Sequence, residues 1–150
     1  TISFNRSFGK THGNASGKGR ELQTRTNGEK TLLAVRVTAS DGTENTFTKA
    51  RLSESIFGGP ADEFNLAKAF DTCSNGKMTF KKAADRIGRS TNIADGVVQV
   101  TLTDPAAIPR NGGSVMVPAV WLELATQFGQ EVSTLANYVM VCLPPRTITG

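Results

Sequence analysis

The stretch from Ala69 to Phe80 constrains the fold most strongly, because the end of a helix pattern that begins at Asp62, a cysteine, a glycine stop and a strand pattern follow one another within it. Three side chains recur here at spacings of four and three, which is the repeat of one helical face: Leu66, Phe70 and Cys73. Gly76 predicts the end of this helix, since glycine readily adopts the left-handed conformation that closes many helices. Met78 and Phe80 then alternate with polar side chains, as in a half-buried strand.

Similar patterns along the rest of the chain predict strands and helices in alternation. We expect strands at residues 31–39, 96–103 and 137–143, a short helix at 52–57, and a long amphipathic helix from about Val117, next to Pro118, to Phe128. Strands that are separated by helices need crossover connections, which favour parallel pairing. The sequence therefore predicts an α/β fold, with α+β as the alternative: a twisted, largely parallel sheet of about four to five strands with packed helices.

The amino-terminal end differs in composition from the rest. Residues 1–36 carry seven Lys or Arg against two Glu, whereas the remaining residues carry ten basic and eleven acidic side chains. We expect residues 1–30 to form a basic, glycine-rich arm and residues 31–150 to form a single α/β domain. A basic arm attracts polyanions, but this one has only Phe4 and Phe8 as stacking platforms, so nucleic acid is a disfavoured partner. No apolar run is long enough to predict a membrane span.

The two cysteines, Cys73 and Cys142, fall at the ends of elements that are predicted to be buried. A disulfide between them is expected, and two buried free thiols are the alternative. Asn5 and Asn14 each begin a sequon for N-glycosylation, which favours a secretory route, where a disulfide would also persist.

The residues predict no complete active site. A zinc site needs several converging His, Cys or carboxylate ligands, and the chain has one histidine, His12, in the arm. It contains no nucleophile elbow, no phosphate-binding loop and no dinucleotide fingerprint. We assign no catalytic residue and no metal ligand.

Five blocks of sequence nevertheless resemble, in order, the gametolysin family of secreted zinc metallopeptidases. The run Cys-Ser-Asn-Gly-Lys, which begins at Cys73, is the most specific part, and the likeness covers residues 31–148. The blocks are residues 33–41, 52–58, 65–80, 96–100 and 138–145. The resemblance implies the amino-terminal part of a metzincin-like catalytic domain, its upper subdomain, with Cys73 and Cys142 as partners. It also implies secretion and hydrolysis of extracellular matrix or cell-wall protein.

The chain departs from the family at two points. The family's His-Glu-x-x-His-x-x-Gly-x-x-His zinc helix would follow the Cys-Leu-Pro-Pro block, and these 150 residues do not contain it. Arg146 stands where the family usually has glycine. We therefore expect a portion of a gametolysin-like endopeptidase that is inactive alone, with zinc held by a downstream segment, or a noncatalytic extracellular structural or binding module. A downstream segment, another chain or another copy is expected to cover an apolar patch next to Cys142.

Overall fold

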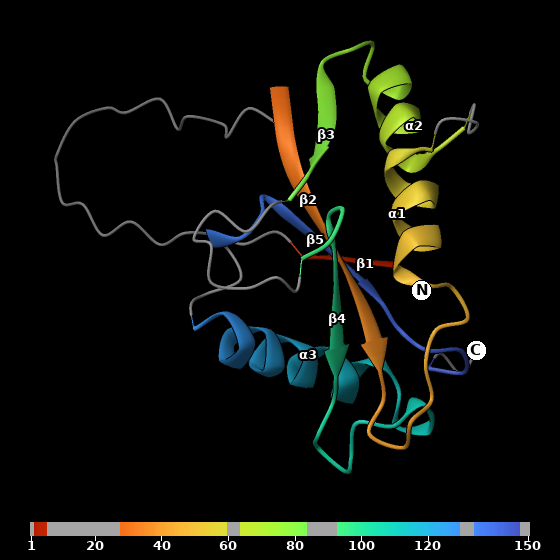
Figure 1. The fold of residues 1–150 in the computed structure, drawn as a ribbon, viewed down its shortest axis with the longest axis vertical. Coiled ribbons are helices and arrows are strands. Elements are labelled where there is room, and N and C mark those ends of the chain that lie inside the picture. Colours follow the sequence, from red (N-terminus) through yellow and green to blue (C-terminus); the bar gives the residue numbers. More distant parts are fainter. Residues whose placement is uncertain (1, 6–27, 60–63, 84–92, 130–133, 148–150) are drawn as a thin grey trace, which may run out of the picture.

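The computed structural model describes residues 2–5, 28–59, 64–83, 93–129 and 134–147 (Figure 1). Within these ranges the elements follow in this order: β1 (Ile2–Asn5), β2 (Gly28–Thr38), α1 (Lys49–Phe57), α2 (Leu66–Cys73), β3 (Met78–Lys82), β4 (Val97–Thr101), the 3-10 turn η1 (Pro109–Asn111), α3 (Gly113–Phe128) and β5 (Tyr138–Cys142). The helix, glycine and strand expected around residues 66–80 are confirmed as α2, its closing turn and β3.

The sheet is built around β2, which pairs along both of its edges. One edge pairs in parallel with β5, and β1 adds to the far side of β5 as an antiparallel strand. The other edge is shared, because residues 28–32 pair in parallel with β3 and residues 34–38 pair in parallel with β4. The predicted α/β class with a largely parallel sheet is therefore confirmed.

β3 and β4 lie end to end along this shared edge. The backbone N–H of Ala83 donates to the carbonyl of Leu32, and the N–H of Ala34 donates to the carbonyl of Gly96, both at 2.9 Å. The chain thus leaves the sheet after Ala83 and returns at Gly96 almost at the same place on β2. Sequence reasoning made no assignment for residues 83–95, and residues 84–92 lie outside the described ranges.

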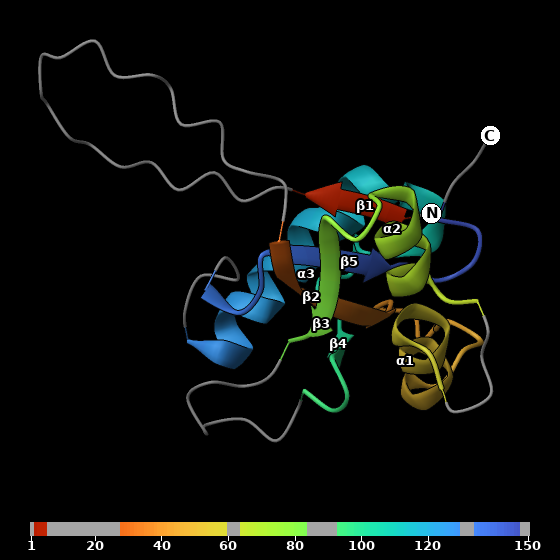
Figure 2. The same cartoon turned by 90° about the horizontal axis from the view of Figure 1, so that it is seen from above.

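Helices cover the two faces of the sheet, with α3 on one side and α1 and α2 on the other (Figures 1 and 2). Alternate side chains of β2 supply the two cores. Leu33, Val35 and Val37 pack with α3, while Leu32 and Ala34 pack with α1 and α2. All five are fully buried. Parallel strands need this cover on both faces, which is why β2 reads as a nearly continuous apolar run.

Two crossover connections leave the neighbouring strands β2 and β4. They run over opposite faces of the sheet and in opposite directions. The chain passes from β2 through α1 and α2 to β3, and from β4 through α3 to β5 on the other edge of β2. Adjacent strands whose connections diverge in this way leave a crevice at their carboxyl ends, and in open α/β sheets such a crevice is the usual ligand site.

The start of α3 differs from the prediction. Sequence reasoning placed it near Pro118, but α3 begins at Gly113 and Pro118 lies inside it. Proline here removes only the hydrogen bond that would reach the carbonyl of Ser114, so the helix tolerates it. The earlier start brings Met116 into the core with no exposed surface. Trp121 on the same helix packs against the core and is partly buried.

The structure does not contain the predicted disulfide, because Cys73 and Cys142 are both free thiols. Cys73 is exposed at the end of α2 and adjoins Ser74, whose Oγ accepts from the N–H of Met78 at the start of β3. Met78 pairs with Gly28, whereas Cys142 pairs with Arg36, eight residues further along β2. At roughly 3.3 Å per residue this separation is about 26 Å, far beyond the roughly 6 Å between Cα atoms that a disulfide spans.

The expected apolar patch near β5 is also not found among the described residues. Val139, Met140, Val141 and Leu143 are each at most 7% exposed. Helices cover both faces at this point, and β1, from the segment predicted to be an arm, pairs with the edge. The backbone of Asn5 belongs to β1, while His12 and Asn14 lie outside the described residues, so both sequons stay predictions.

Among the helices that the structure describes, none has the length and apolar character needed to span a membrane.

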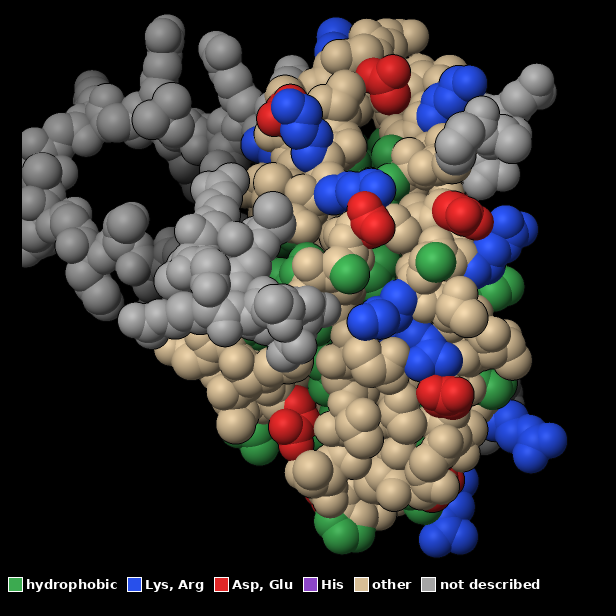
Figure 3. Space-filling view, in the orientation of Figure 1, with side chains coloured by type: hydrophobic (Ala, Val, Ile, Leu, Met, Phe, Trp, Pro, Cys, Tyr) green, Lys and Arg blue, Asp and Glu red, His purple; other side chains and the backbone are tan. Residues whose placement is uncertain are grey.

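On the face drawn in Figure 3, basic side chains are interspersed with acidic ones. The described residues on that face therefore form no continuous basic stripe of the kind that binds polyanions.

Candidate functional site

A cleft of about 840 Å³ lies at the carboxyl ends of the parallel strands, where their loops meet. The loop after β2 contributes Asp41 and Thr43, the loop after β4 contributes Ile108, Pro109 and Arg110, and the segment after β5 contributes Pro145 and Arg146. This volume is in the range of small-molecule sites, about 300–1,000 Å³. The cleft also lies in the crevice that the diverging crossovers create.

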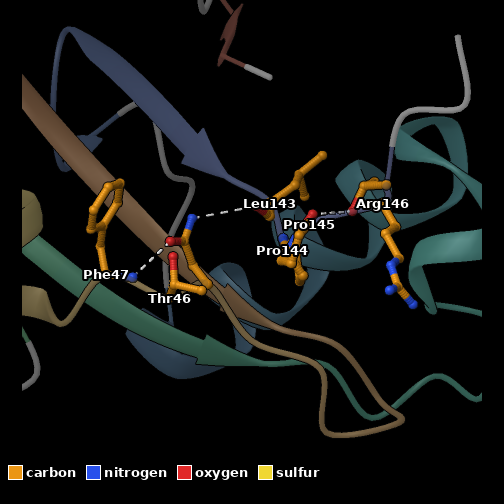
Figure 4. A pocket seen from close by; sticks show the side chains of 8 residues that line it. Thr46, Phe47, Leu143, Pro144, Pro145 and Arg146 are labelled. Carbon is orange, nitrogen blue, oxygen red and sulfur yellow. Dashed lines mark hydrogen bonds between the residues drawn. The ribbon is translucent and has the colours of Figure 1, made fainter.

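A second cavity of about 390 Å³ adjoins this cleft and shares Pro145 and Arg146 with it. The rest of its lining comes from Asn45–Phe47, before α1, and from other residues of the segment 143–147 after β5. Figure 4 shows Phe47 and Arg146 at opposite ends of this group, with Leu143 to Pro145 between them. The Phe47 side chain is 50% exposed, so this end of the cavity is an apolar wall open to solvent.

Arg36 fixes the loop that leads from β2 to α1. Its Nε donates to the carbonyl of Phe47 at 2.6 Å and one terminal nitrogen donates to the carbonyl of Asn45 at 2.7 Å. The other terminal nitrogen donates to Glu44 at 3.0 Å and to Gln99 on β4 at 2.7 Å. With its side chain only 11% exposed, this guanidinium joins the loop and two strands into one unit.

The segment after β5 is held by Thr147, which is 3% exposed. Its hydroxyl donates to the carbonyl of Pro144 at 2.7 Å and approaches the sulfur of Met116 on α3 at 3.7 Å. This short turn requires Arg146 to adopt φ 68°, a left-handed conformation that costs a non-glycine residue about 1–2 kcal/mol. The backbone at Arg146 is therefore strained at the point where its side chain lines the cleft.

The loops after β2 and β4 are linked to each other. Both the N–H and the hydroxyl of Ser40 donate to the carbonyl of Ala107, at 3.2 and 3.3 Å. In the same turn the Asp41 carboxylate accepts from the N–H of Thr43 at 3.0 Å. This hydrogen bond is the main reason that the pKa of Asp41 is lowered, and the charge of Arg110 lowers it slightly further. Asp41 is thus an ionised group that closes its own turn.

Arg110 and Arg146 differ from the other arginines in the described part of the chain. Arg36 is fully engaged, and Arg51 pairs with Glu54 at 3.4 Å. Within the described residues, neither Arg110 nor Arg146 donates a hydrogen bond or forms an ion pair. Both line the cleft. The cleft therefore presents two guanidinium groups whose N–H donors are available to a ligand.

The residues predicted from the sequence do not gather here. Cys73 lies at the opposite end of the strands, and Cys142 pairs with Arg36 near the cleft, where burial raises the pKa of its thiol to about 11. Sequence reasoning missed Arg110, and it noted Arg146 only as a departure from the family pattern and not as a site residue. The signal that could have found them is that each follows a predicted strand that ends at a proline turn, since parallel strands bring such turns to one edge.

The described residues also do not fit a zinc ion. They contain no group of three or more His, Cys, Asp or Glu side chains that could hold a metal.

The chain matches no protein-family model, no curated protein and no solved structure.

Proposed function

We propose that this chain forms the sheet-and-helix portion of a gametolysin-like, secreted zinc endopeptidase domain that acts on extracellular matrix or cell-wall protein. One observation carries the proposal, namely that each block of family resemblance coincides with a successive element of the fold. Residues 33–41 belong to β2 and its turn, 52–58 to α1, 65–80 to α2 and β3, 96–100 to β4, and 138–145 to β5 and its turn. Together these elements are the parallel sheet and the helices on one of its faces.

The position of Arg146 supports the same alignment. The family usually has glycine there, and glycine is the residue that adopts a positive φ without a steric penalty. The backbone at Arg146 has φ 68°. The sequence difference from the family therefore falls at a residue whose conformation favours the family's own choice.

The zinc ligands in this proposal belong to a segment outside this sequence, because the described residues do not supply a ligand set. We assign no step of peptide hydrolysis to the described residues. What they supply is a rigid parallel sheet whose carboxyl-end loops are tied together by Arg36, Ser40 and Thr147.

The proposal is tested by recovering the complete coding sequence, expressing its product, and measuring bound zinc and hydrolysis of a protein substrate. We expect a downstream His-Glu-x-x-His helix, stoichiometric zinc, and hydrolysis that stops when a chelator removes the metal. The 150-residue chain serves as the control and should show neither property. A complete gene product without zinc or peptidase activity would overturn the proposal.

The cleft favours a second candidate, a noncatalytic extracellular module that keeps the scaffold and binds a ligand. Two arginines that form no hydrogen bond or ion pair within the described residues, together with apolar surface beside them, are features of a binding site whether or not the domain continues into a zinc helix. A complete gene product that lacks the zinc helix would select this second function.

A further inference from the structure

The cleft at the carboxyl ends of β2, β4 and β5 has a charge and shape that point to one class of ligand. Its charged donors are the guanidinium groups of Arg110 and Arg146, which come from different loops. Ile108, Pro109 and Pro145 supply apolar surface beside them. A volume of about 840 Å³ far exceeds that of a single ion, so a ligand that fills it has an organic body as well as a charged group.

We infer that this cleft binds the carboxylate of an organic molecule, with Arg110 and Arg146 holding the carboxylate and the apolar lining holding its body. Planar guanidinium groups match the two oxygens of a carboxylate, and such charge-assisted hydrogen bonds are among the strongest in proteins. The carboxylate belongs either to a small organic acid or to the free carboxyl end of a peptide, because the recognised group is the same in both.

The one acidic side chain in the lining does not oppose this reading. Asp41 uses its carboxylate to accept from the N–H of Thr43 within the turn after β2, and the charge of Arg110 has only a minor effect on its pKa. The lining thus carries two cations that form no hydrogen bond or ion pair within the described residues, against one anion that already has a hydrogen-bond donor.

The strain at Arg146 agrees with a binding role. The Arg146 side chain forms no hydrogen bond or ion pair within the described residues, yet Arg146 occupies a backbone conformation that is unfavourable for a non-glycine residue. An arginine at this strained position is explained if its guanidinium group binds a ligand. The inference does not rest on the peptidase proposal, since it involves no zinc and only residues of this chain.

The experiment uses the purified 150-residue chain and measures binding by NMR titration or calorimetry. N-acetylphenylalanine is the acid probe, and its neutral amide is the matched control. We expect the acid to bind and the amide to bind at least about tenfold more weakly, since it lacks the charge. A phenylalanine-ending tripeptide with a free or an amidated carboxyl end distinguishes the two sources: tighter binding of the free tripeptide than of the acid probe identifies a peptide end, and weaker binding identifies a small acid.

Variants locate the site. Arg110→Gln and Arg146→Gly should each weaken binding of the acid by about tenfold or more. Arg146→Gly suits the local φ, so loss of the fold will not explain its effect. Arg51→Gln is the control, because Arg51 is an exposed arginine on α1 that does not line the cleft. Equal binding of acid and amide, no binding of any probe, or equal weakening by Arg51→Gln would overturn the inference.

Discussion

Arg36 on β2 and Gln99 on β4 face each other in the parallel register, and the guanidinium donates to the Gln99 side-chain oxygen at 2.7 Å. The Gln99 amide nitrogen in turn donates to the hydroxyl of Thr38 at 2.6 Å. This polar pair lies on the sheet face that α1 and α2 cover, just beyond the apolar core. It connects the sheet to the loop before α1, so it determines where that loop enters the cleft region.

Replacing Arg36 by methionine should therefore destabilise the protein by about 2–4 kcal/mol, because the change removes several charge-assisted hydrogen bonds and leaves partly buried acceptors without donors. The measurement is urea denaturation followed by circular dichroism. Arg51→Met is the matched control, since its pair with Glu54 is exposed and should contribute less than about 1 kcal/mol. Equal effects of the two changes would contradict the structural role of Arg36.

The backbone at Arg146 gives a second prediction that is independent of any ligand. Arg146→Gly should be more stable than Arg146→Ala by about 1 kcal/mol, since both lose the side chain but only glycine adopts φ 68° without strain. Thermal and urea denaturation of the two variants measure this difference. An alanine variant as stable as the glycine variant would show that the turn after β5 has a different conformation.

The turn at Gly96, where the chain returns to the sheet, gives a third prediction. A Cβ added there would lie 2.8 Å from the Phe57 ring of α1, at φ 76°, whereas a Cβ at Gly42, at φ 82°, would meet nothing within 4 Å. Gly42→Ala should cost about 1–2 kcal/mol through backbone strain alone. Gly96→Ala should cost roughly 1–3 kcal/mol more, through the clash.

A double-mutant cycle with Phe57→Leu checks the cause of this extra cost. The smaller side chain should recover part of the loss in the Gly96→Ala background and none in the Gly42→Ala background. The absence of any coupling between residues 57 and 96 would count against the packing of α1 over this turn.

The fold was predictable from the sequence where local periodicity and burial agree, as at β2, whose apolar run is buried on both faces. The start of α3 was not predictable in this way. Pro118 is a strong local signal for the first turn of a helix, but α3 accommodates it in its interior with the loss of one hydrogen bond. The prediction of a disulfide was wrong for a different reason. Sequence spacing does not reveal that Cys73 and Cys142 lie at opposite ends of parallel strands. The cleft likewise depends on register and strand order, which bring Arg110 and Arg146 together.

The thiols provide a fourth prediction. Mass spectrometry under non-reducing conditions should show no bond between Cys73 and Cys142, and reductant should leave the melting temperature unchanged. Iodoacetamide should modify Cys73 first, since it is exposed, while Cys142 should react slowly in the folded protein at a rate that rises with pH towards its pKa of about 11. A native disulfide between the two would contradict the strand register.

The raised pKa of Cys142 also determines the direction in which the free energy of unfolding changes with pH. Burial favours the neutral thiol, so the unfolded chain ionises first, near the ordinary value of 9.0. The contribution of Cys142 to stability is therefore complete below that pH and is lost as the pH rises through about 11. Cys142→Ser or Cys142→Ala should reduce this alkaline loss relative to the parent chain.

The last prediction concerns β1, which extends the sheet beyond β5. Ile2 pairs with Cys142 and Asn5 pairs with Val139, so the backbone of β1 satisfies donors and acceptors along an otherwise open edge. Deleting residues 1–27 should expose that edge, lower the free energy of unfolding by on the order of 1–3 kcal/mol, and promote self-association, because unpaired strand edges bind other strands. Urea denaturation and light scattering after size-exclusion chromatography measure the two effects. The matched control replaces residues 6–27 by a Gly-Ser linker of equal length, which keeps β1 and should retain both the stability and the association state of the parent chain. If the deletion variant is as stable as the parent and associates no more than the parent does, β1 does not contribute to the sheet in solution.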